Sequence, residues 1–458
     1  MTDTTPDALA EFMAREWANP APMVDGPSPA APFHARRRAA VSDRFPGDWI
    51  VVPTGNPKVR ANDTDYRFRP GTDFAWLTGA QEPDAVLVIR PGRQTLYTAP
   101  RSDRSTPAFF TDRRYGELWV GPRLGVEETA RLLEIETAPL GELEAALKEA
   151  DGAVVRVVRG FDGSVDALVE PAGDADTELL AALAELRLIK DDHEVQCLQE
   201  AVDATVLGFE DVVRALPEAA GYSERWVEGT FNRRARTEGN DVGYDTIAAC
   251  GHHACTLHWV RNDGPVRSGD LLLLDAGVEG AELYTADVTR TLPVSGHFNA
   301  EQREVYDAVW RAQRAGIGAC RPGAGFMDPH RAAMRVLAEW LIETGILTGT
   351  LDEALDPDRR WHSRYTLHGT SHMLGLDVHD CANTRNGYRD HELRPGMVLT
   401  VEPGCYLQPD DLTVPERFRG IGVRIEDDVL ITEDGCRVLS AALPTQADAV
   451  ESWMAGLL

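Results

Sequence analysis

The sequence predicts a two-domain α/β protein in which both domains mix helices and strands. Its 458 residues exceed the length over which one hydrophobic core keeps growing. The pattern also changes along the chain: short strand-like and helical runs come first, a long helical stretch follows, and longer apolar strand candidates dominate after Gly221. We therefore expect an N-terminal mixed α/β domain over residues 1–174 and a C-terminal domain over residues 175–458, with the boundary in a segment rich in proline, glycine and acids.

Hydrophobic periodicity predicts the elements of the N-terminal domain. Short apolar runs predict strands at 48–55 (DWIVVPTG), 73–79 (DFAWLTG), 84–90 (DAVLVIR), 94–100 (QTLYTAP) and 152–160 (GAVVRVVRG). Apolar residues at helical spacing predict helices at 125–136 (GVEETARLLEIE) and 141–150 (GELEAALKEA). This alternation is typical of a compact domain in which helices cover a sheet.

The C-terminal domain begins with helical spacing that continues from residue 177 to 216, which we interpret as two helices. Lys190 lies in this stretch and is expected to be a solvated helix charge. Strands are predicted at 245–250 (DTIAAC), 270–279 (DLLLLDAGVE), 284–294 (YTADVTRTLPV), 396–404 (GMVLTVEPG) and 422–432 (GVRIEDDVLIT).

Charge and composition exclude several classes of partner. The chain has 74 acidic and 46 basic residues and a net charge of −28, which argues against nucleic acid and anionic membranes as partners. It favours cationic substrates, such as peptides with a free amino terminus. No apolar run is long enough to span a bilayer, and the acidic segment MTDTTPDALAEFMAREWA is not a secretory signal. Seven scattered cysteines are typical of a reducing compartment, so we expect a cytoplasmic protein.

Four apolar runs of the C-terminal domain contain or precede a carboxylate. These carboxylates are Asp275 in LLLLDAG, Asp287 in YTADVTRT, Glu402 in MVLTVEPG and Glu426 in GVRIEDD. Burying a carboxylate is costly unless it is paired, hydrogen-bonded or bound to a cation. One such residue is usually a solvated strand end, but four in one domain indicate a shared site. Strand alternation supports this, since it puts Arg424 and Glu426 on one face and Val423 and Ile425 on the other.

The segment HGTSHMLGLDVHD, residues 368–380, holds three histidines. One imidazole added to the four carboxylates makes a dinuclear metal site plausible, because two divalent cations would balance the four negative charges. Such oxygen-rich ligation suits Mn²⁺, Mg²⁺ or Co²⁺ better than a thiolate zinc site does. His368 and His372 are four residues apart, but Gly369 and Gly375 disfavour a helix that would make both of them ligands.

A competing metal site lies at CGHHACTLH, residues 250–258. Cys250, His252, His253, Cys255 and His258 could form a zinc cluster, but their spacing lacks the second ligand pair of the common patterns. We interpret the two cysteines, His252 and His253 as part of a loop whose cysteines are small buried hydrophobes.

Taken in order, the motifs resemble aminopeptidase P (Xaa-Pro aminopeptidase), a group within the pita-bread metallopeptidase family. The matching pieces are ACTLHW, LLLLDAG, YTADVTRT, HGTSHMLGLDVHD, TVEPGCY and GVRIEDD, together with YRFRPGTDFAWLTGAQEPDAVLVI in the N-terminal domain. The resemblance implies a C-terminal pita-bread domain, with a curved antiparallel sheet flanked by helices. It also implies an N-terminal domain that serves assembly or gates substrate length.

The resemblance also implies roles for individual residues. It makes Asp275, Asp287, His372, Glu402 and Glu426 the ligands of two divalent ions, with Asp287 and Glu426 bridging them. Glu402 would be the general base, His258, His368 and His379 would bind substrate and assist catalysis, and Tyr406 and Arg424 would support substrate binding. Mn²⁺ is the expected metal, with Co²⁺, Mg²⁺ and Zn²⁺ as alternatives.

One departure from the family concerns a turn. Eleven residues separate Asp275 from Asp287, one more than is usual in the family. We expect the extra residue in the turn at 280–282, where a longer hairpin loop absorbs it without moving the strands.

The implied activity is hydrolysis of the N-terminal Xaa-Pro bond by a hydroxide that bridges two metals. Expected substrates are peptides with proline in second position, and the expected assembly is a homodimer or homotetramer. Two alternatives remain: a prolidase, which shares the ligands but cleaves only dipeptides, and a metal-free creatinase-like hydrolase or binding protein.

Overall fold

The computed structural model describes residues 5–18, 20–385 and 387–458, which form two compact units, 1–183 and 184–458. The division falls inside helix α9 (Ala175–Arg187), whereas the sequence-based boundary at 174/175 lies at the start of that helix.

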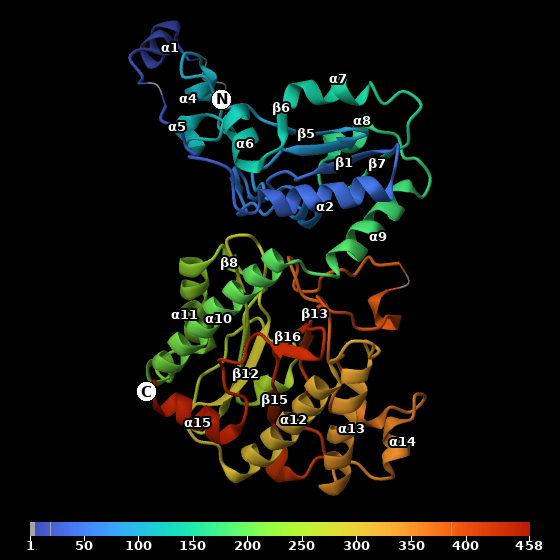
Figure 1. The fold of residues 1–458 in the computed structure, drawn as a ribbon. Helices are drawn as coiled ribbons and strands as arrows, with labels where there is room; N and C mark the ends of the chain where they lie inside the picture. The colour runs from blue at the N-terminus through green and yellow to red at the C-terminus, as the bar shows by residue number, and fades with distance from the viewer. Residues whose placement is uncertain (1–4, 19, 386) are drawn as a thin grey trace. The chain divides into compact units, whose positions relative to one another are not determined.

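The N-terminal unit is built around a five-stranded sheet with the strand order β6-β5-β4-β1-β7. Its strands are β1 (Trp49–Pro53), β4 (Val86–Arg90), β5 (Arg93–Thr98), β6 (Glu136–Pro139) and β7 (Val155–Val157), with a small separate hairpin of β2 (Val59–Ala61) and β3 (Thr64–Asp65). The β1–β4 and β4–β5 pairs are antiparallel, and the two outer pairs are parallel. Figure 1 shows α7 (Leu143–Leu147) along one face of the sheet and α2 (Ala31–Arg44) along the other.

The remaining helices of this unit are short. They are α1 (Asp7–Met13), α3 (Thr72–Thr78), α4 (Ala108–Thr111), α5 (Glu117–Val120), α6 (Val126–Leu133) and α8 (Gly163–Leu168). The predicted strand at 73–79 was wrong, because these residues form α3. The helix ends at Gly79, which adopts a left-handed φ of 71°. Phe74 to Thr78 are all buried, so the apolar run had no helical periodicity to distinguish it from a buried strand.

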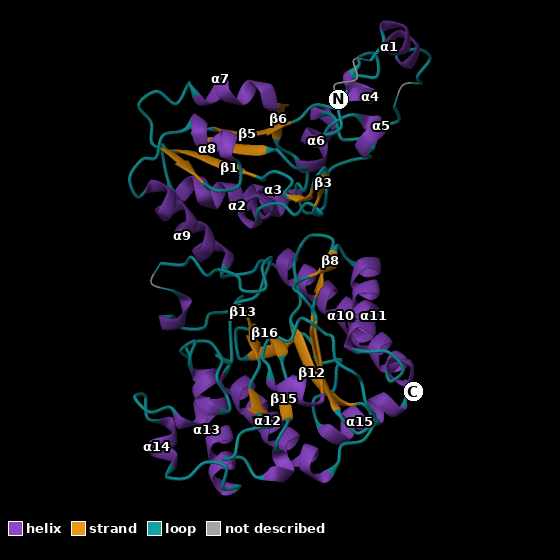
Figure 2. Ribbon diagram, turned by 180° about the vertical axis from the view of Figure 1, so that it is seen from behind, coloured by secondary structure: helices purple, strands orange, loops and turns teal. Residues whose placement is uncertain are grey.

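The C-terminal unit places antiparallel strands between two pairs of long helices. One pair is α10 (Asp192–Ala219) and α11 (Glu224–Glu238); the other is α12 (Ala300–Ala319) and α13 (Asp328–Glu343). Figures 1 and 2 show the strands between these pairs, with α14 (Leu351–Leu355) beside α13 and α15 (Ala447–Ala455) near the C-terminus. The predicted two helices after residue 177 are confirmed as α9 and α10.

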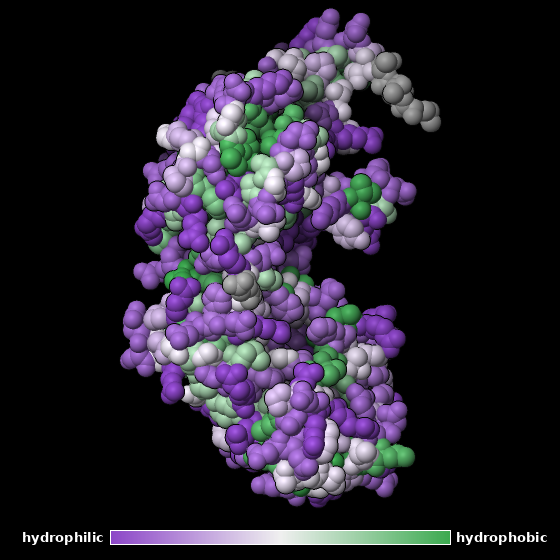
Figure 3. Space-filling view, turned by 90° about the vertical axis from the view of Figure 1, so that its right-hand side faces the viewer, coloured by the Kyte–Doolittle hydropathy of each residue, from purple (hydrophilic) through white to green (hydrophobic). Residues whose placement is uncertain are grey.

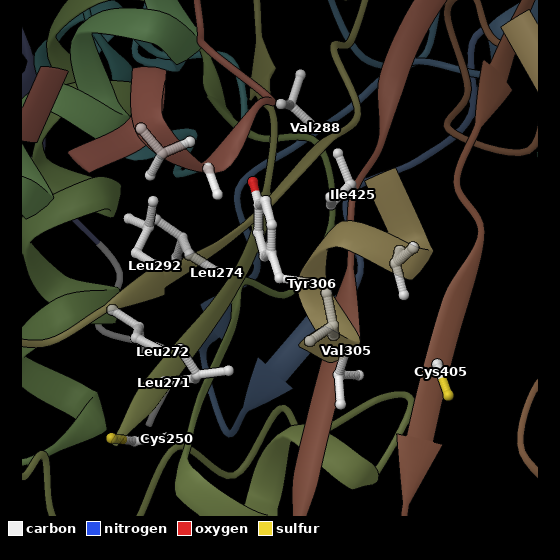
Figure 4. Close-up of a cluster of buried hydrophobic side chains, with 14 of the residues drawn as sticks. Cys250, Leu271, Leu272, Leu274, Val288, Leu292, Val305, Tyr306, Cys405 and Ile425 are labelled. Atoms are coloured by element: carbon white, nitrogen blue, oxygen red, sulfur yellow. The ribbon is translucent and has the colours of Figure 1, made fainter. Parts of the chain in front are cut away.

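The strands of this unit form short antiparallel sheets with the orders β12-β10-β9, β11-β8, β13-β16-β17 and β14-β15. Their bounds are β8 (Asp241–Val242), β9 (Ile247–Cys250), β10 (Leu271–Ala276), β11 (Val278–Glu279), β12 (Val288–Pro293), β13 (Val398–Val401), β14 (Gly404–Leu407), β15 (Ile421–Arg424), β16 (Asp427–Ile431) and β17 (Cys436–Val438). Side chains from β10, β12 and α12 meet in the main core, where Figure 4 shows Leu274, Val288 and Tyr306. This packing is what holds the strand ends in place.

The face drawn in Figure 3 is largely hydrophilic, and its apolar patches are separate from one another. Among the described helices, none combines the length and the hydropathy needed to cross a membrane.

Candidate metal centre and substrate cavity

One cavity in the C-terminal unit gathers nearly all the residues that the sequence singled out. Its volume is about 620 Å³. Its walls include Asp275, Asp287, His372, Glu402 and Glu426, together with His258, His368, His379 and Arg424. These residues come from separate segments of the chain, so it is the fold that brings them together.

The ends of antiparallel strands position the four carboxylates. Asp275 lies near the end of β10, opposite Thr289 of β12, and Asp287 comes directly before β12. Glu402 follows β13, and Glu426 lies between β15 and β16. As strand alternation predicted, Val423 and Ile425 enter the core while Arg424 and Glu426 face the cavity.

Two of these carboxylates are almost fully buried and resist ionisation. Asp287 and Glu426 are 5% and 1% exposed. Burial raises the pKa of Asp287 to about 6, and burial, followed by repulsion from Asp287 and Glu402, raises the pKa of Glu426 well above its ordinary value. One carboxylate oxygen from each residue and a ring nitrogen of His372 lie within 4.8 Å of one another. A group with this charge and spacing suits a cation.

His372 presents one ring nitrogen to the carboxylates. Its Nδ1 lies 3.1 Å from the Met373 carbonyl, to which it donates, and this leaves Nε2 facing Asp287 Oδ2 at 3.3 Å and Glu402 Oε1 at 3.5 Å. Burial lowers the pKa of His372, but the hydrogen bond to Asp287 and the charge of Glu402 outweigh it and raise the pKa to about 9. Because the Met373 carbonyl holds the proton on Nδ1, Nε2 is the nitrogen that would give up its proton and bind a metal.

A hydrogen-bond chain runs from Arg424 through Tyr406 to His368, whose ring lies beside Glu402. Arg424 Nη1 donates to the Tyr406 hydroxyl at 2.8 Å, and His368 Nε2 lies 2.7 Å from the same oxygen. His368 Nδ1 lies 2.9 Å from the Gly369 carbonyl, which can only accept, so Nδ1 carries a proton and, in the neutral ring, Nε2 accepts from the Tyr406 hydroxyl. That Nδ1 lies 3.4 Å from Glu402 Oε2. Burial raises the pKa of Glu402, but His368, His372 and Arg424 together lower it to about 2, so Glu402 is ionised.

Tyr406 therefore lies behind the cavity wall rather than on it. Its ring is buried, and its hydroxyl orients His368 and Arg424. His258 and His379 are exposed on the wall itself. The His379 ring centroid lies 4.4 Å from that of His372, and burial followed by this neighbour lowers the pKa of His379.

Three further residues of the site were not predicted from the sequence. The Tyr244 hydroxyl lies 2.6 Å from Asp275 Oδ1 and 2.5 Å from Asp287 Oδ1. Thr289 donates to Glu426 at 2.6 Å, and Asp428 accepts the backbone N–H of Asp287 at 3.1 Å. No local pattern in DVGYDT predicts that its tyrosine reaches two distant aspartates. Only strand pairing reveals these contacts.

The structure corrects the expectation for Lys190. This residue lies between α9 and α10 with its side chain fully buried, and its Nζ lies 3.3 Å from Asp380 Oδ2. Arg187 Nη2 lies 3.2 Å from the other oxygen, Oδ1. Helical spacing predicted that Lys190 is exposed to solvent, but the lysine is buried and pairs with Asp380. Asp380 directly follows His379, so this ion cluster anchors the segment that carries a cavity histidine.

The structure shows where the longer turn closes and how the residues of the alternative zinc cluster are used. The turn closes at 280–284, with Leu283 at a φ of 70°, and Glu282 approaches His193 to 2.7 Å. At CGHHACTLH, Cys250 and Cys255 are buried in core clusters, and His253 Nδ1 lies 2.8 Å from Glu224. Within the described part of the chain, these residues do not converge as metal ligands would.

Family models match both parts of the chain. Residues 196–433 match metallopeptidase family M24, and residues 34–155 match the aminopeptidase P N-terminal domain. Among curated relatives, Xaa-Pro aminopeptidase 1 of Streptomyces coelicolor is 55% identical over 98% of this chain and 92% of its own length. Xaa-Pro aminopeptidase of Escherichia coli is 32% identical over 92% of this chain and 97% of its own length.

Solved structures match over nearly the same extent. Aminopeptidase PepP of Pseudomonas aeruginosa superposes with a TM-score of 0.84 at 31% identity, covering 94% of this chain and 99% of its own. Aminopeptidase P of E. coli with the inhibitor Pro-Leu gives a TM-score of 0.82 at 31% identity, covering 93% and 98%. These matches confirm the pita-bread architecture expected of the C-terminal domain. The chain belongs to metallopeptidase family M24, and within it to the aminopeptidase P group.

Proposed function

We propose that this protein is a metal-dependent Xaa-Pro aminopeptidase, which removes the first residue from peptides whose second residue is proline. The observation that carries the proposal is the convergence of four carboxylates and one imidazole on one cavity, in a chain of the aminopeptidase P group. This cavity is wide enough for a peptide terminus and holds acidic, basic and imidazole groups together.

The donor set fits two divalent cations. The residues that would hold them are Asp275, Asp287, His372, Glu402 and Glu426, of which Asp287, His372 and Glu426 offer atoms within 4.8 Å of one another. The raised pKa values of Asp287 and Glu426 support this assignment, because they indicate that the cluster has too little positive charge of its own. When bound, such ions lower the pKa of a water molecule and polarise the scissile carbonyl. We propose Mn²⁺, with Co²⁺, Mg²⁺ and Zn²⁺ as alternatives, on the oxygen-rich character of the set.

The side chains around this centre supply proton transfer and hydrogen bonds. Glu402 is ionised and acts as the general base that takes a proton from the attacking water. His258 and His379 face the cavity, where they hydrogen-bond the peptide and assist protonation of the leaving nitrogen. His379 has a lowered pKa, so it is neutral near pH 7 and can donate from one ring nitrogen while accepting at the other. The Tyr406 hydroxyl hydrogen-bonds both His368 and Arg424 and so fixes their positions near Glu402.

Selectivity for proline follows from its missing N–H. The bond that is cut contains a tertiary amide nitrogen. Apolar side chains can therefore pack against this nitrogen without burying an unpaired N–H donor. An ordinary peptide in the same pose would bury an unpaired N–H, which costs about 1–3 kcal/mol.

A peptide panel tests the proposal. The Mn²⁺-loaded protein should cleave Xaa-Pro-Yaa peptides and longer Xaa-Pro peptides, and should leave matched Xaa-Ala-Yaa peptides largely intact. Cleavage of Xaa-Pro dipeptides alone would instead identify a prolidase. Absence of metal uptake together with absence of peptidase activity in every metal tested would favour the metal-free alternative.

Location and assembly are part of the same proposal. Six of the cysteines form no disulfide, which supports a reducing, cytoplasmic location: Cys250, Cys255, Cys320, Cys381, Cys405 and Cys436. We propose a homodimer or homotetramer in which the N-terminal domain, residues 1–174, serves assembly or limits substrate length. Light scattering of the full chain and of a chain lacking those residues tests that role.

A further inference from the structure

A second cavity of the C-terminal unit opens beside the substrate cavity. Its volume is about 570 Å³. Residues of α13 line it, as does the segment around residues 355–369. His368, Gly369 and Arg389 line both cavities. Because they share these residues, the two cavities lie next to each other.

The second cavity is cationic in a strongly acidic protein. Four arginines line it, Arg331, Arg335, Arg360 and Arg389, and we call this group the arginine pocket. Three histidines accompany them, and among the residues that the structure describes no aspartate or glutamate lines the wall. The chain as a whole has 74 acidic and 46 basic residues, so a wall of this size without a carboxylate runs against its composition. Clustered positive charge in a concave wall attracts anions.

Most of these guanidinium groups have no acidic partner. Arg331 pairs with Asp328, whereas Arg335, Arg360 and Arg389 make no side-chain hydrogen bond or ion pair with any residue that the structure describes. The pKa of His330, which also lines the pocket, is lowered to about 4, first by burial and then by His362, His368, Arg331 and Arg389. The neighbouring positive groups therefore add to the effect of burial on His330.

We propose that the arginine pocket binds a carboxylate on the part of the peptide that follows proline. This inference rests on the proposed aminopeptidase activity. An aminopeptidase holds a single residue on the amino side of the cut, so any binding surface that continues away from the centre serves the leaving chain. Guanidinium groups bind carboxylates in bidentate geometry and keep their charge at every physiological pH. The carboxylate is either the C-terminus of a short peptide or an acidic side chain in a longer one.

Matched peptides separate these two sources. The substrates are Xaa-Pro peptides with glutamate or glutamine at successive positions after proline, each prepared as the free acid and as the C-terminal amide. We expect a carboxylate at the favoured position to raise kcat/KM about tenfold, mainly through KM, as one charge-assisted contact would. General electrostatics predict the opposite sign, because a protein with a net charge of −28 repels anionic peptides.

Variants assign the effect to the pocket. In Arg335→Gln/Arg360→Gln, the Glu/Gln and acid/amide ratios of kcat/KM should fall to about one. Arg214→Gln is the control, because Arg214 is an exposed arginine on α10 that pairs with Glu210, and both ratios should remain at the wild-type value. Cleavage of the glutamine amides tests the aminopeptidase activity separately. Ratios of one in the wild type at every position, or ratios kept by the double variant, would overturn the proposal.

Discussion

Replacing Asp380 by asparagine should destabilise the C-terminal unit by about 3–5 kcal/mol, because it leaves two buried cations without the carboxylate between them. The side chains of Lys190 and Arg187 are 0% and 8% exposed, and both approach Asp380 to within 3.3 Å. Asparagine has nearly the same volume as aspartate, so packing is kept and the charge is removed. Since domains are stable by about 5–15 kcal/mol, this loss is a large fraction of the total.

Urea titration of the full chain, followed by tryptophan fluorescence and circular dichroism, measures the effect. With a slope of about 3 kcal/mol per molar urea, the unfolding midpoint should fall by about 1–2 M. The matched control is Glu144→Gln, which neutralises an exposed carboxylate paired with Lys148 and should leave the midpoint unchanged. The double variant Asp380→Asn/Lys190→Met removes one of the two buried cations together with the carboxylate, so part of the loss should be recovered.

The pH dependence follows from the pKa of Asp380. Burial raises this pKa, but Arg187 and Lys190 lower it overall. Ionised Asp380 therefore contributes its full stabilisation of the folded state above the unfolded-state pKa of about 3.9. This stabilisation is lost as the pH falls through the lower pKa of the folded state. The difference in urea midpoint between the wild type and Asp380→Asn should therefore be the same at pH 6 as at pH 8. A midpoint within about 0.2 M of the wild type at both pH values would refute the stabilising role of the cluster.

Three further outcomes concern the metal centre. Glu402→Gln should keep the circular dichroism spectrum but lower kcat by about 10²–10⁴-fold, and a near-normal kcat would remove Glu402 from the general-base role. Tyr244→Phe takes a hydroxyl from Asp275 and Asp287 and should weaken metal affinity or activity by about 10–100-fold, measured by metal titration; unchanged affinity and activity would show that this contact is dispensable. In the chelated protein, Asp287 and His372 have folded pKa values of about 6 and about 9, both raised, so their stabilisation is lost as the pH rises. The thermal midpoint of the chelated protein should therefore decrease as the pH is raised from about 4 to about 9, whereas that of the Mn²⁺-loaded protein should not. Parallel plots of midpoint against pH for the two forms would contradict this.

The order and type of the cavity residues could be predicted from sequence. A carboxylate beside a long apolar run, as in LLLLDAG, has few stable environments other than a paired or metal-bound one. Four such runs and one histidine-rich segment were enough to indicate a shared site. Strand alternation also predicted which face Arg424 and Ile425 would take, because a period of two is a local property of the backbone.

Local sequence patterns did not predict the structure where a segment is buried on all sides or where a residue's partner is distant in the sequence. The run DFAWLTG is buried on every side, so its periodicity could not separate a helix from a strand. Lys190 had the sequence neighbours of an exposed helix residue, yet it pairs with an acid 190 positions away. Tyr244 and the arginine pocket likewise depend on residues brought together from different segments.

The sequence by itself determined the family, the five candidate ligands and the acidic character of the protein, because these depend on residue type and order. Tertiary structure alone decided which hydroxyl orients the carboxylates, which cations are buried beside Asp380, and where four arginines form a pocket next to the substrate cavity. The physical reason is that hydrogen bonds, ion pairs and cavity walls form between groups that are close in space, and the chain carries no local record of those distances.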